Sequence, residues 1–193
     1  MSLKEIVTIV TSTITAVAAG VGAWVAVSGI QAWKKQLKGK TDYELARRYL
    51  RAVYKTRDAI KFVRNPFVSI EEIDKAAKEK NVSSTSIDDG GIRGVYSRRW
   101  DKVVEAGSDL SVELLEAEVS WGKGALEIEK DFDVCRRKLF ADLKIFLSFG
   151  LNLGKRPDPK EHIIYDMGEG DTYNAEMEKA ILKIEEYLKP HLR

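Results

Sequence analysis

The chain is 193 residues long, 44% hydrophobic and 32% charged, a composition typical of a folded, helix-rich protein and not of a disordered one. The formal net charge of +2 hides an asymmetry, because residues 34–64 carry eleven Lys or Arg against three Asp or Glu, while residues 65–193 carry twenty against twenty-six. An excess of basic charge confined to residues 34–64 excludes an evenly basic nucleic-acid-binding domain, and we expect no nucleic-acid partner.

The N-terminal segment Ile6–Trp33 has no charged residue over 28 positions, against roughly 20 that a helix needs to cross a bilayer. Threonines interrupt its first half, but in a helix their hydroxyls can bond to carbonyls of the preceding turn. The last residue of the segment and the lysines after it are those of a membrane interface: Trp33, Lys34, Lys35, Lys38 and Lys40. We predict a transmembrane anchor over residues 1–33 and a cytosolic domain over residues 34–193.

Charge on the two sides of this segment predicts its orientation. Seven Lys or Arg follow it within about 20 residues, whereas Lys4 is the only basic side chain before it. The positive-inside rule therefore predicts a single-pass protein with its N-terminus outside and its C-terminal domain in the cytoplasm.

Two other interpretations of the segment stay open. Ala16-Val17-Ala18 resembles the cleavage site of a signal peptide, although Glu5 cancels Lys4 before the apolar run and the run continues to Ile30. The segment is otherwise a buried helix of a soluble protein, although such helices rarely stay uncharged for so long.

Small residues recur every four positions within the segment, at Ala18, Gly22 and Ala26. Such a stripe lets the backbones of two helices approach closely in a membrane. It predicts a homo-oligomer. The alternative is that alanine and glycine are simply common in transmembrane helices.

The next predicted helix starts at a capping box, Thr41-Asp42-Tyr43-Glu44, and ends at Arg64, before Asn65 and Pro66. One of its faces is mainly apolar: Leu45, Tyr49, Ala52, Thr56, Ile60 and Val63. A neighbouring face is basic: Arg47, Arg48, Arg51 and Lys55. The basic face is a candidate contact for a phosphate or lipid head group, the alternative being a solvated or membrane-facing surface.

The remaining chain also shows helical patterns. A second capping box, Ser69–Glu72, predicts a short helix to about Lys80, followed by a polar loop. Further helices are predicted from about Val95 to a break at residues 121–124, from about Ala125 to Phe149, and from Tyr173 to Leu188. A loop with a short extended piece at residues 163–165 precedes the last helix. The fold class is all-α, one transmembrane helix followed by an antiparallel helical bundle.

Motifs for catalysis or cofactor binding are absent from the sequence. It contains no G-x-x-x-x-G-K-[ST], G-x-S-x-G or H-E-x-x-H pattern. The two histidines lie in or near irregular sequence, which makes a histidine-based metal site or catalytic dyad a poor fit. The single cysteine, Cys135, rules out an intrachain disulfide, and its apolar neighbours predict a buried thiol in preference to a reactive one. We expect no catalytic residues, no metal and no cofactor.

The run Gly29–Thr41, followed by Tyr43–Arg47, resembles uncharacterised short bacterial and prophage-borne membrane proteins that have an N-terminal anchor and a helical cytosolic tail. This resemblance implies a location in the bacterial inner membrane and supplies no site residues.

Three functions are compatible with these features. The first is a non-enzymatic, membrane-anchored interaction or scaffold protein with an unknown cytosolic protein partner. The second is an oligomerising membrane effector of the defence or toxin type. The third is a phosphate-directed enzyme, which would need Arg47, Arg51, Arg98 and Arg99 to converge on one concave pocket. The sequence favours the first.

Overall fold

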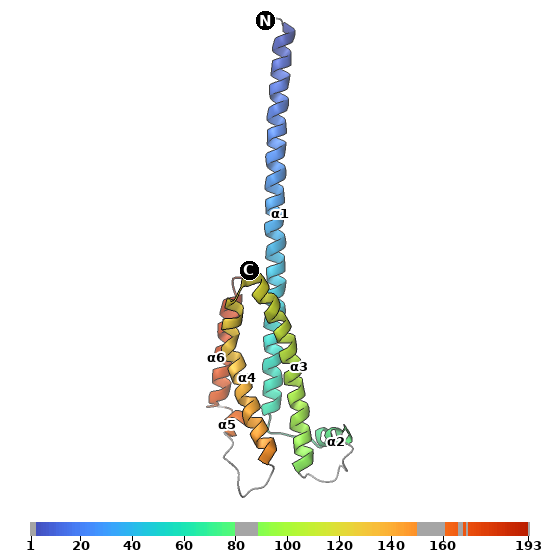
Figure 1. The fold of residues 1–193 in the computed structure, drawn as a ribbon, viewed down its shortest axis with the longest axis vertical. Coiled ribbons are helices and arrows are strands. Elements are labelled where there is room, and N and C mark those ends of the chain that lie inside the picture. Colours follow the sequence, from blue (N-terminus) through green and yellow to red (C-terminus); the bar gives the residue numbers. More distant parts are fainter. Residues whose placement is uncertain (1–2, 80–88, 150–160, 166–167, 169, 193) are drawn as a thin grey trace. The chain divides into compact units, whose positions relative to one another are not determined.

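The computed structural model describes residues 3–79, 89–149, 161–165, 168 and 170–192, and all regular structure in these ranges is α-helical (Figure 1). The all-α fold class is therefore confirmed for the described residues. The helices are α1 (Leu3–Arg64), α2 (Ile70–Glu79), α3 (Asp89–Trp121), α4 (Gly124–Phe149), α5 (Glu161–Ile164) and α6 (Thr172–Leu188).

Contacts within the chain divide it into two units, Met1–Tyr43 and Glu44–Arg193, and we call the second unit the domain. The boundary predicted from the sequence lies earlier, after Trp33. The two boundaries differ because residues 34–41 are helical but exposed, so they add no side chain to the core that begins at Leu45.

The helix start predicted at Thr41 is wrong, because α1 continues through this position. The hydroxyl of Thr41 donates to the carbonyl of Leu37, 3.1 Å away, and caps no new helix. The lysine, glutamine and leucine residues at positions 34–38 are good helix formers, and the single glycine at position 39 costs only about 1 kcal/mol. The predicted helix end at Arg64 is confirmed.

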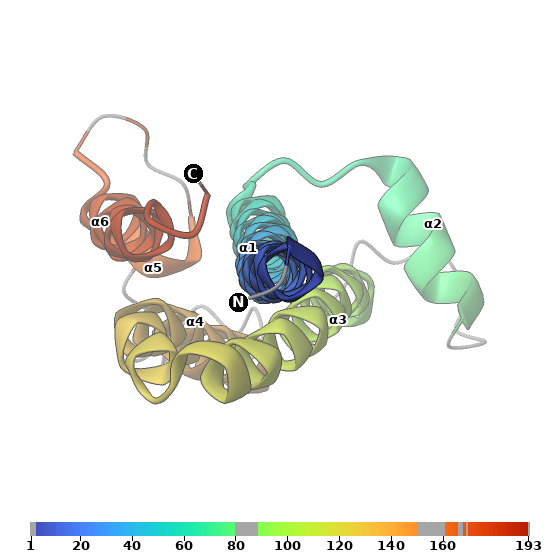
Figure 2. The ribbon, with the colours of Figure 1, turned by 90° about the horizontal axis from the view of Figure 1, so that it is seen from above.

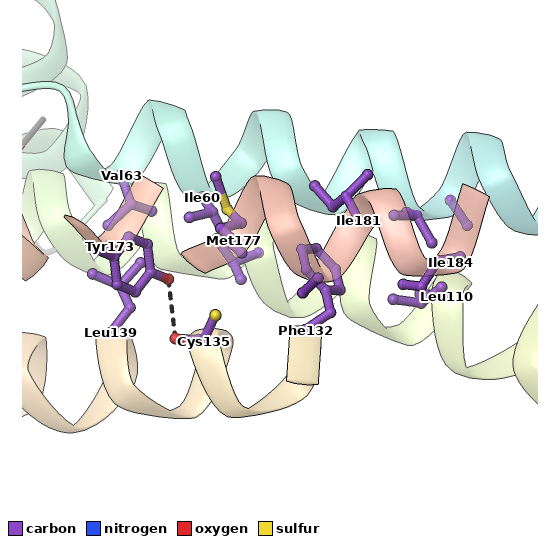
Figure 3. Close-up of a cluster of buried hydrophobic side chains, with 14 of the residues drawn as sticks. Ile60, Val63, Leu110, Phe132, Cys135, Leu139, Tyr173, Met177, Ile181 and Ile184 are labelled. Carbon is purple, nitrogen blue, oxygen red and sulfur yellow. Dashed lines mark hydrogen bonds between the residues drawn. The ribbon is translucent and has the colours of Figure 1, made fainter. Parts of the chain in front are cut away.

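One face each of α1, α3, α4 and α6 forms the core of the domain. On α1 it is the predicted face, 0–6% exposed: Leu45, Tyr49, Ala52, Thr56, Ile60 and Val63. The predicted face of α6 is also buried: Met177, Ile181, Ile184 and Leu188. Figure 3 shows the middle of this core, where Phe132 of α4 lies among side chains of α1, α3 and α6. Burying each large apolar side chain contributes roughly 1.5–3 kcal/mol.

Ion pairs across the domain relate neighbouring helices. α1 lies beside α3, and α4 lies beside α6 (Figure 2). In both pairs of helices, the residues that form ion pairs have numbers that rise along one helix and fall along the other. The pairs are Arg48–Glu113, Lys55–Asp109, Asp131–Lys183 and Lys138–Glu176. The predicted break between α3 and α4 is confirmed, with Gly122 at a φ of 86° that favours glycine.

The capping box of α2 is confirmed. The amide of Glu72 donates to the hydroxyl of Ser69, and the amide of Ser69 donates to the carboxylate of Glu72, both over 3.2 Å. α2 packs closely on α3 at Gly94, where a Cβ would lie 2.9 Å from the Cβ of Ala76. Glycine at position 94 is therefore what allows the two helices this approach.

Two predicted elements differ from the structure. α3 begins at Asp89 and not near Val95, because Val95 and Tyr96 are buried and their packing overrides the low helix propensity of the glycines before them. Residues 161–164 form a short helix where an extended piece was predicted, and both Ile163 and Ile164 are buried in it. Residues 81–88 and 150–160 of the predicted loops lie outside the described residues.

Candidate membrane segment and charged sites

α1 includes a segment near the N-terminus that is long and apolar enough to cross a membrane, and none of it is buried inside the chain. Trp24 is 72% exposed, and Val17, Val21 and Val25 are each more than half exposed. Leaving such side chains in water is unfavourable, at roughly 25 cal/mol per Å² of apolar surface. The core helix of a soluble protein has its apolar residues covered, whereas the apolar side chains described in this segment are exposed.

Threonine hydroxyls in this segment bond to the helix backbone. The hydroxyls of Thr8 and Thr15 donate to carbonyls four residues earlier, over 2.9 Å, and that of Thr11 donates to the carbonyl of Thr8 over 3.0 Å. The back-bonding predicted for these residues is confirmed. The threonines therefore present little unsatisfied polarity to an apolar surrounding.

The predicted interfacial residues all lie exposed on α1: Trp33, Lys34, Lys35, Lys38 and Lys40. The small-residue stripe of Ala18, Gly22 and Ala26 is also exposed. A Cβ added at Gly22 would meet nothing within 4 Å, so no described part of this chain packs on the stripe.

The structure separates the four residues of the predicted basic face. Arg48 binds two carboxylates of α3, those of Glu113 and Glu116, and these hydrogen bonds raise its pKa. Lys55 binds Asp109 over 2.7 Å. Arg48 and Lys55 therefore join α1 to α3.

Arg47 and Arg51 are the other two members of this face, and both are exposed. Neither forms an ion pair with a described residue. They are therefore the members of the set that remain open to a phosphate or lipid head group.

Arg64, at the end of α1, is fully buried, which its sequence context did not predict. Its guanidinium donates to the carbonyls of Ile163 and Tyr165, at 2.8 and 2.7 Å, and to the carboxylate of Asp171 at 2.7 Å. It also lies over the ring of Tyr173, 4.5 Å from its centroid. Asp171 in turn caps α6 by accepting from the amide of Asn174. Arg64 thus holds the residues that precede α6 against the C-terminal end of α1.

Arg99 of α3 is a second buried arginine. It binds both carboxylate oxygens of Glu72, at 3.0 and 2.9 Å, and the carbonyls of Asn65 and Phe67, both at 2.6 Å. The hydrogen bond from Arg99 lowers the pKa of Glu72. These bonds hold the connection between α1 and α2 against α3, so Arg99 has a structural role.

The four arginines named for a phosphate-directed enzyme do not converge. Arg98 and Arg99 line a pocket of about 340 Å³ together with side chains of α1, α2 and α3. Arg47 and Arg51 are not among its lining residues, and the donors of Arg99 are occupied by Glu72 and backbone carbonyls. The geometry required for that enzyme is therefore not met by these four residues.

Glu129 of α4 is a buried carboxylate that was not among the residues predicted from the sequence. Burial, together with the nearby charge of Asp133, raises its pKa to about 7. The burial of Glu129 could have been predicted from its spacing, because Glu129 lies four residues after Ala125 and three before Phe132, both of which are buried.

No three or more His, Cys, Asp or Glu side chains within the described ranges are grouped so as to hold a metal ion. Neither a protein-family model, nor a curated protein, nor a solved structure matches the chain. Its function is therefore inferred from its own residues.

Proposed function

We propose that the protein is a membrane-anchored, non-enzymatic interaction or scaffold protein of the bacterial inner membrane. One observation carries this proposal: an uncharged segment of α1 with exposed apolar side chains ends at Trp33 and is followed at once by a group of lysines. A bilayer would cover the apolar side chains, and the aromatic and basic residues suit its interface.

The orientation proposed is N-terminus outside and domain in the cytoplasm. It is supported by the excess of Lys and Arg after the segment over the single Lys4 before it. Lysines at the cytoplasmic surface also attract anionic lipids, at about 1 kcal/mol each. Arg47 and Arg51, which have no described carboxylate partner, extend this basic region into the domain.

The domain is proposed to be an antiparallel helical bundle that presents its outer surfaces to a cytosolic protein. The support comes from the ion pairs of α1 with α3 and of α4 with α6, in which residue numbers run in opposite directions. Its two buried arginines bind carbonyls and carboxylates of the chain itself. The outer helix faces are therefore where a partner is expected to bind.

A second candidate function is an oligomerising membrane effector, and the exposed stripe of Ala18, Gly22 and Ala26 favours it. Gly22→Leu is expected to weaken association of the segment and any toxicity to the cell. Gly20→Leu is the matched control, because position 20 lies on the opposite side of the helix. Equal association and equal cell phenotype in the two variants would rule out the stripe as the basis of the function.

The test of the main proposal is fractionation of the full-length protein, tagged at its C-terminus, in a bacterial cell. The protein is expected to stay with the membrane after an alkaline wash, and its tag to be protected from protease in intact spheroplasts. Release into the soluble fraction would overturn the anchor, and digestion of the tag would overturn the orientation.

A charge variant makes this test specific to the segment. Val21→Asp with Val25→Asp places two carboxylates in the middle of the predicted span, at roughly 3 kcal/mol each, and is expected to release the protein from the membrane. Val119→Asp is the control, because Val119 is an exposed valine of the domain. Retention of the double variant at the level of the control would contradict the proposal.

A further inference from the structure

The outer face of α3 carries apolar side chains that no other described helix covers. Val104, Val112, Leu115 and Val119 are 56–88% exposed, and Ser108 lies between the first two. The spacing of these five residues is four, four, three and four, which places them on one side of a helix. We call these five residues the α3 face.

A shallow apolar hollow adjoins one end of the α3 face. Trp100 of α3 stacks on Phe140 of α4, with ring centroids 5.0 Å apart. The hollow of about 350 Å³ beside them is lined also by Val104, Gly107 and Arg136. The glycine matters here, because a Cβ at position 107 would collide with the guanidinium of Arg136. Apolar surface thus continues from the α3 face toward α4.

Charges of opposite sign border the α3 face on its two sides. On the side of α1 lies an acidic flank, in which four carboxylates share two cations: Glu105, Asp109, Glu113 and Glu116 with Lys55 and Arg48. On the side of α4 lies a basic flank, in which Arg136 and Arg137 share the single carboxylate of Asp133. Among these ion-paired groups, carboxylates outnumber cations by four to two on the acidic flank, and cations outnumber carboxylates by two to one on the basic flank.

We propose that the α3 face binds the α3 face of a second copy of this chain, with the two helices parallel and related by a two-fold axis along them. This symmetry brings the acidic flank of each copy against the basic flank of the other. A two-fold axis perpendicular to α3 would instead bring flanks of like charge together. Charge complementarity thus selects both the partner and the direction.

The parallel arrangement has a second property that suits this chain. Both copies of Glu44, where the domain begins, lie at the same end of the paired domains. Two copies anchored in one bilayer need their domains to begin at the same end. The contact itself follows from the surface of the domain and does not depend on the anchor. A shared membrane would favour the contact by raising the effective concentration of the copies.

The experiment uses single cysteines and a short bis-maleimide crosslinker on membranes that contain the full-length protein. Ser108→Cys and Val119→Cys are each expected to yield crosslinked dimer, because equivalent residues of a parallel pair face each other. The native Cys135 is buried and is expected to give none. Ser120→Cys is the matched control, because Ser120 is exposed on α3 but lies off the α3 face.

The results discriminate among arrangements. Dimer at both test positions and not at the control supports the proposal. Dimer at position 108 without dimer at 119 would refute the parallel direction, because positions about 16 Å apart along a helix cannot both be self-facing in an antiparallel pair. No dimer at either position, or as much at Ser120→Cys, would overturn the interface.

Two further variants test the chemistry of the contact in the Ser108→Cys background. Leu115→Lys is expected to abolish the crosslink, whereas Leu182→Lys, at an exposed leucine of α6, is expected to leave it unchanged. Arg137→Glu is expected to lower the crosslinked fraction about five-fold, and Glu105→Arg added to it to restore much of the loss. Retention in the membrane is measured in parallel, so a failed anchor and a failed interface give different results.

Discussion

Glu129→Gln is expected to stabilise the domain above pH 7. Glu129 is 8% exposed, and burial raises its pKa from the ordinary 4.5 to about 7. At 1.36 kcal/mol for each pKa unit, this difference corresponds to ~3 kcal/mol. The folded state holds the proton more tightly than the unfolded state, so stability is fully present below pH 4.5 and falls as pH rises through about 7. Glutamine has no charge to lose and removes that dependence.

The environment of Glu129 sets an upper bound on this gain. Tyr49 lies within electrostatic reach of Glu129, and its buried hydroxyl has no hydrogen-bond partner among the described residues. A glutamine amide brings two donors that also need partners in this site, and an unpaired buried donor costs about 1–3 kcal/mol. Subtracting this cost from ~3 kcal/mol leaves an expected net gain at pH 8 of up to about 2 kcal/mol, with no gain at pH 4.5.

The measurement is urea unfolding of the full-length protein in non-ionic detergent, followed by circular dichroism at pH 4.5, 6 and 8. Glu127→Gln is the control on the same helix, because Glu127 is exposed. It lies in the first turn of α4, where a negative charge is favourable, so its loss is expected to cost about 0.5 kcal/mol. Equal pH dependence in Glu129→Gln and the unaltered chain would refute the assignment of Glu129 as the buried titrating group.

Two further changes test the contacts of α6. Arg64→Met is expected to lower the free energy of unfolding by about 3–5 kcal/mol, because it leaves the carboxylate of Asp171 buried without its cation. Adding Asp171→Asn is expected to recover part of this loss. A larger loss in the double variant than in Arg64→Met, measured by urea unfolding, would contradict this explanation. Tyr173→Phe is expected to lower the free energy of unfolding by about 1 kcal/mol, because it removes only the hydrogen bond to the carbonyl of Cys135. A loss above 3 kcal/mol in the same assay would contradict the view that this one hydrogen bond is the contribution of the hydroxyl.

Periodicity predicted the parts of the fold in which apolar side chains repeat along a helix. The core faces of α1 and α6 could be predicted because residues such as Leu45 and Tyr49, or Met177 and Ile181, recur at helical spacing. The capping box at Ser69 is local and was also predictable. The sequence at Thr41 has the same local capping pattern, but the helix before it continues through this position. The helix propensity of the residues before Thr41 therefore outweighs the capping pattern.

The charged sites were harder to predict because their partners are distant in sequence. Arg48 was placed on a basic face, yet its partner Glu113 lies 65 residues away. Arg64 and Arg99 look like ordinary surface residues in sequence, because the carbonyls they bind belong to the short helix α5 and to irregular segments, whose positions no periodicity encodes. The long uncharged segment of α1 was predictable as a helix apolar enough to cross a membrane, because the absence of charge over its length is visible in the sequence itself.

The bond between Arg64 and Asp171 joins residues 107 positions apart, and this separation matters while the chain is being synthesised. At about 5–20 residues per second, a ribosome needs roughly 5–20 s to reach Asp171 after Arg64. During that interval the apolar face of α1 is already made, but α6, which covers part of it, is not. The nascent chain therefore has to keep Ile60 and Val63 from aggregating until its last helix arrives.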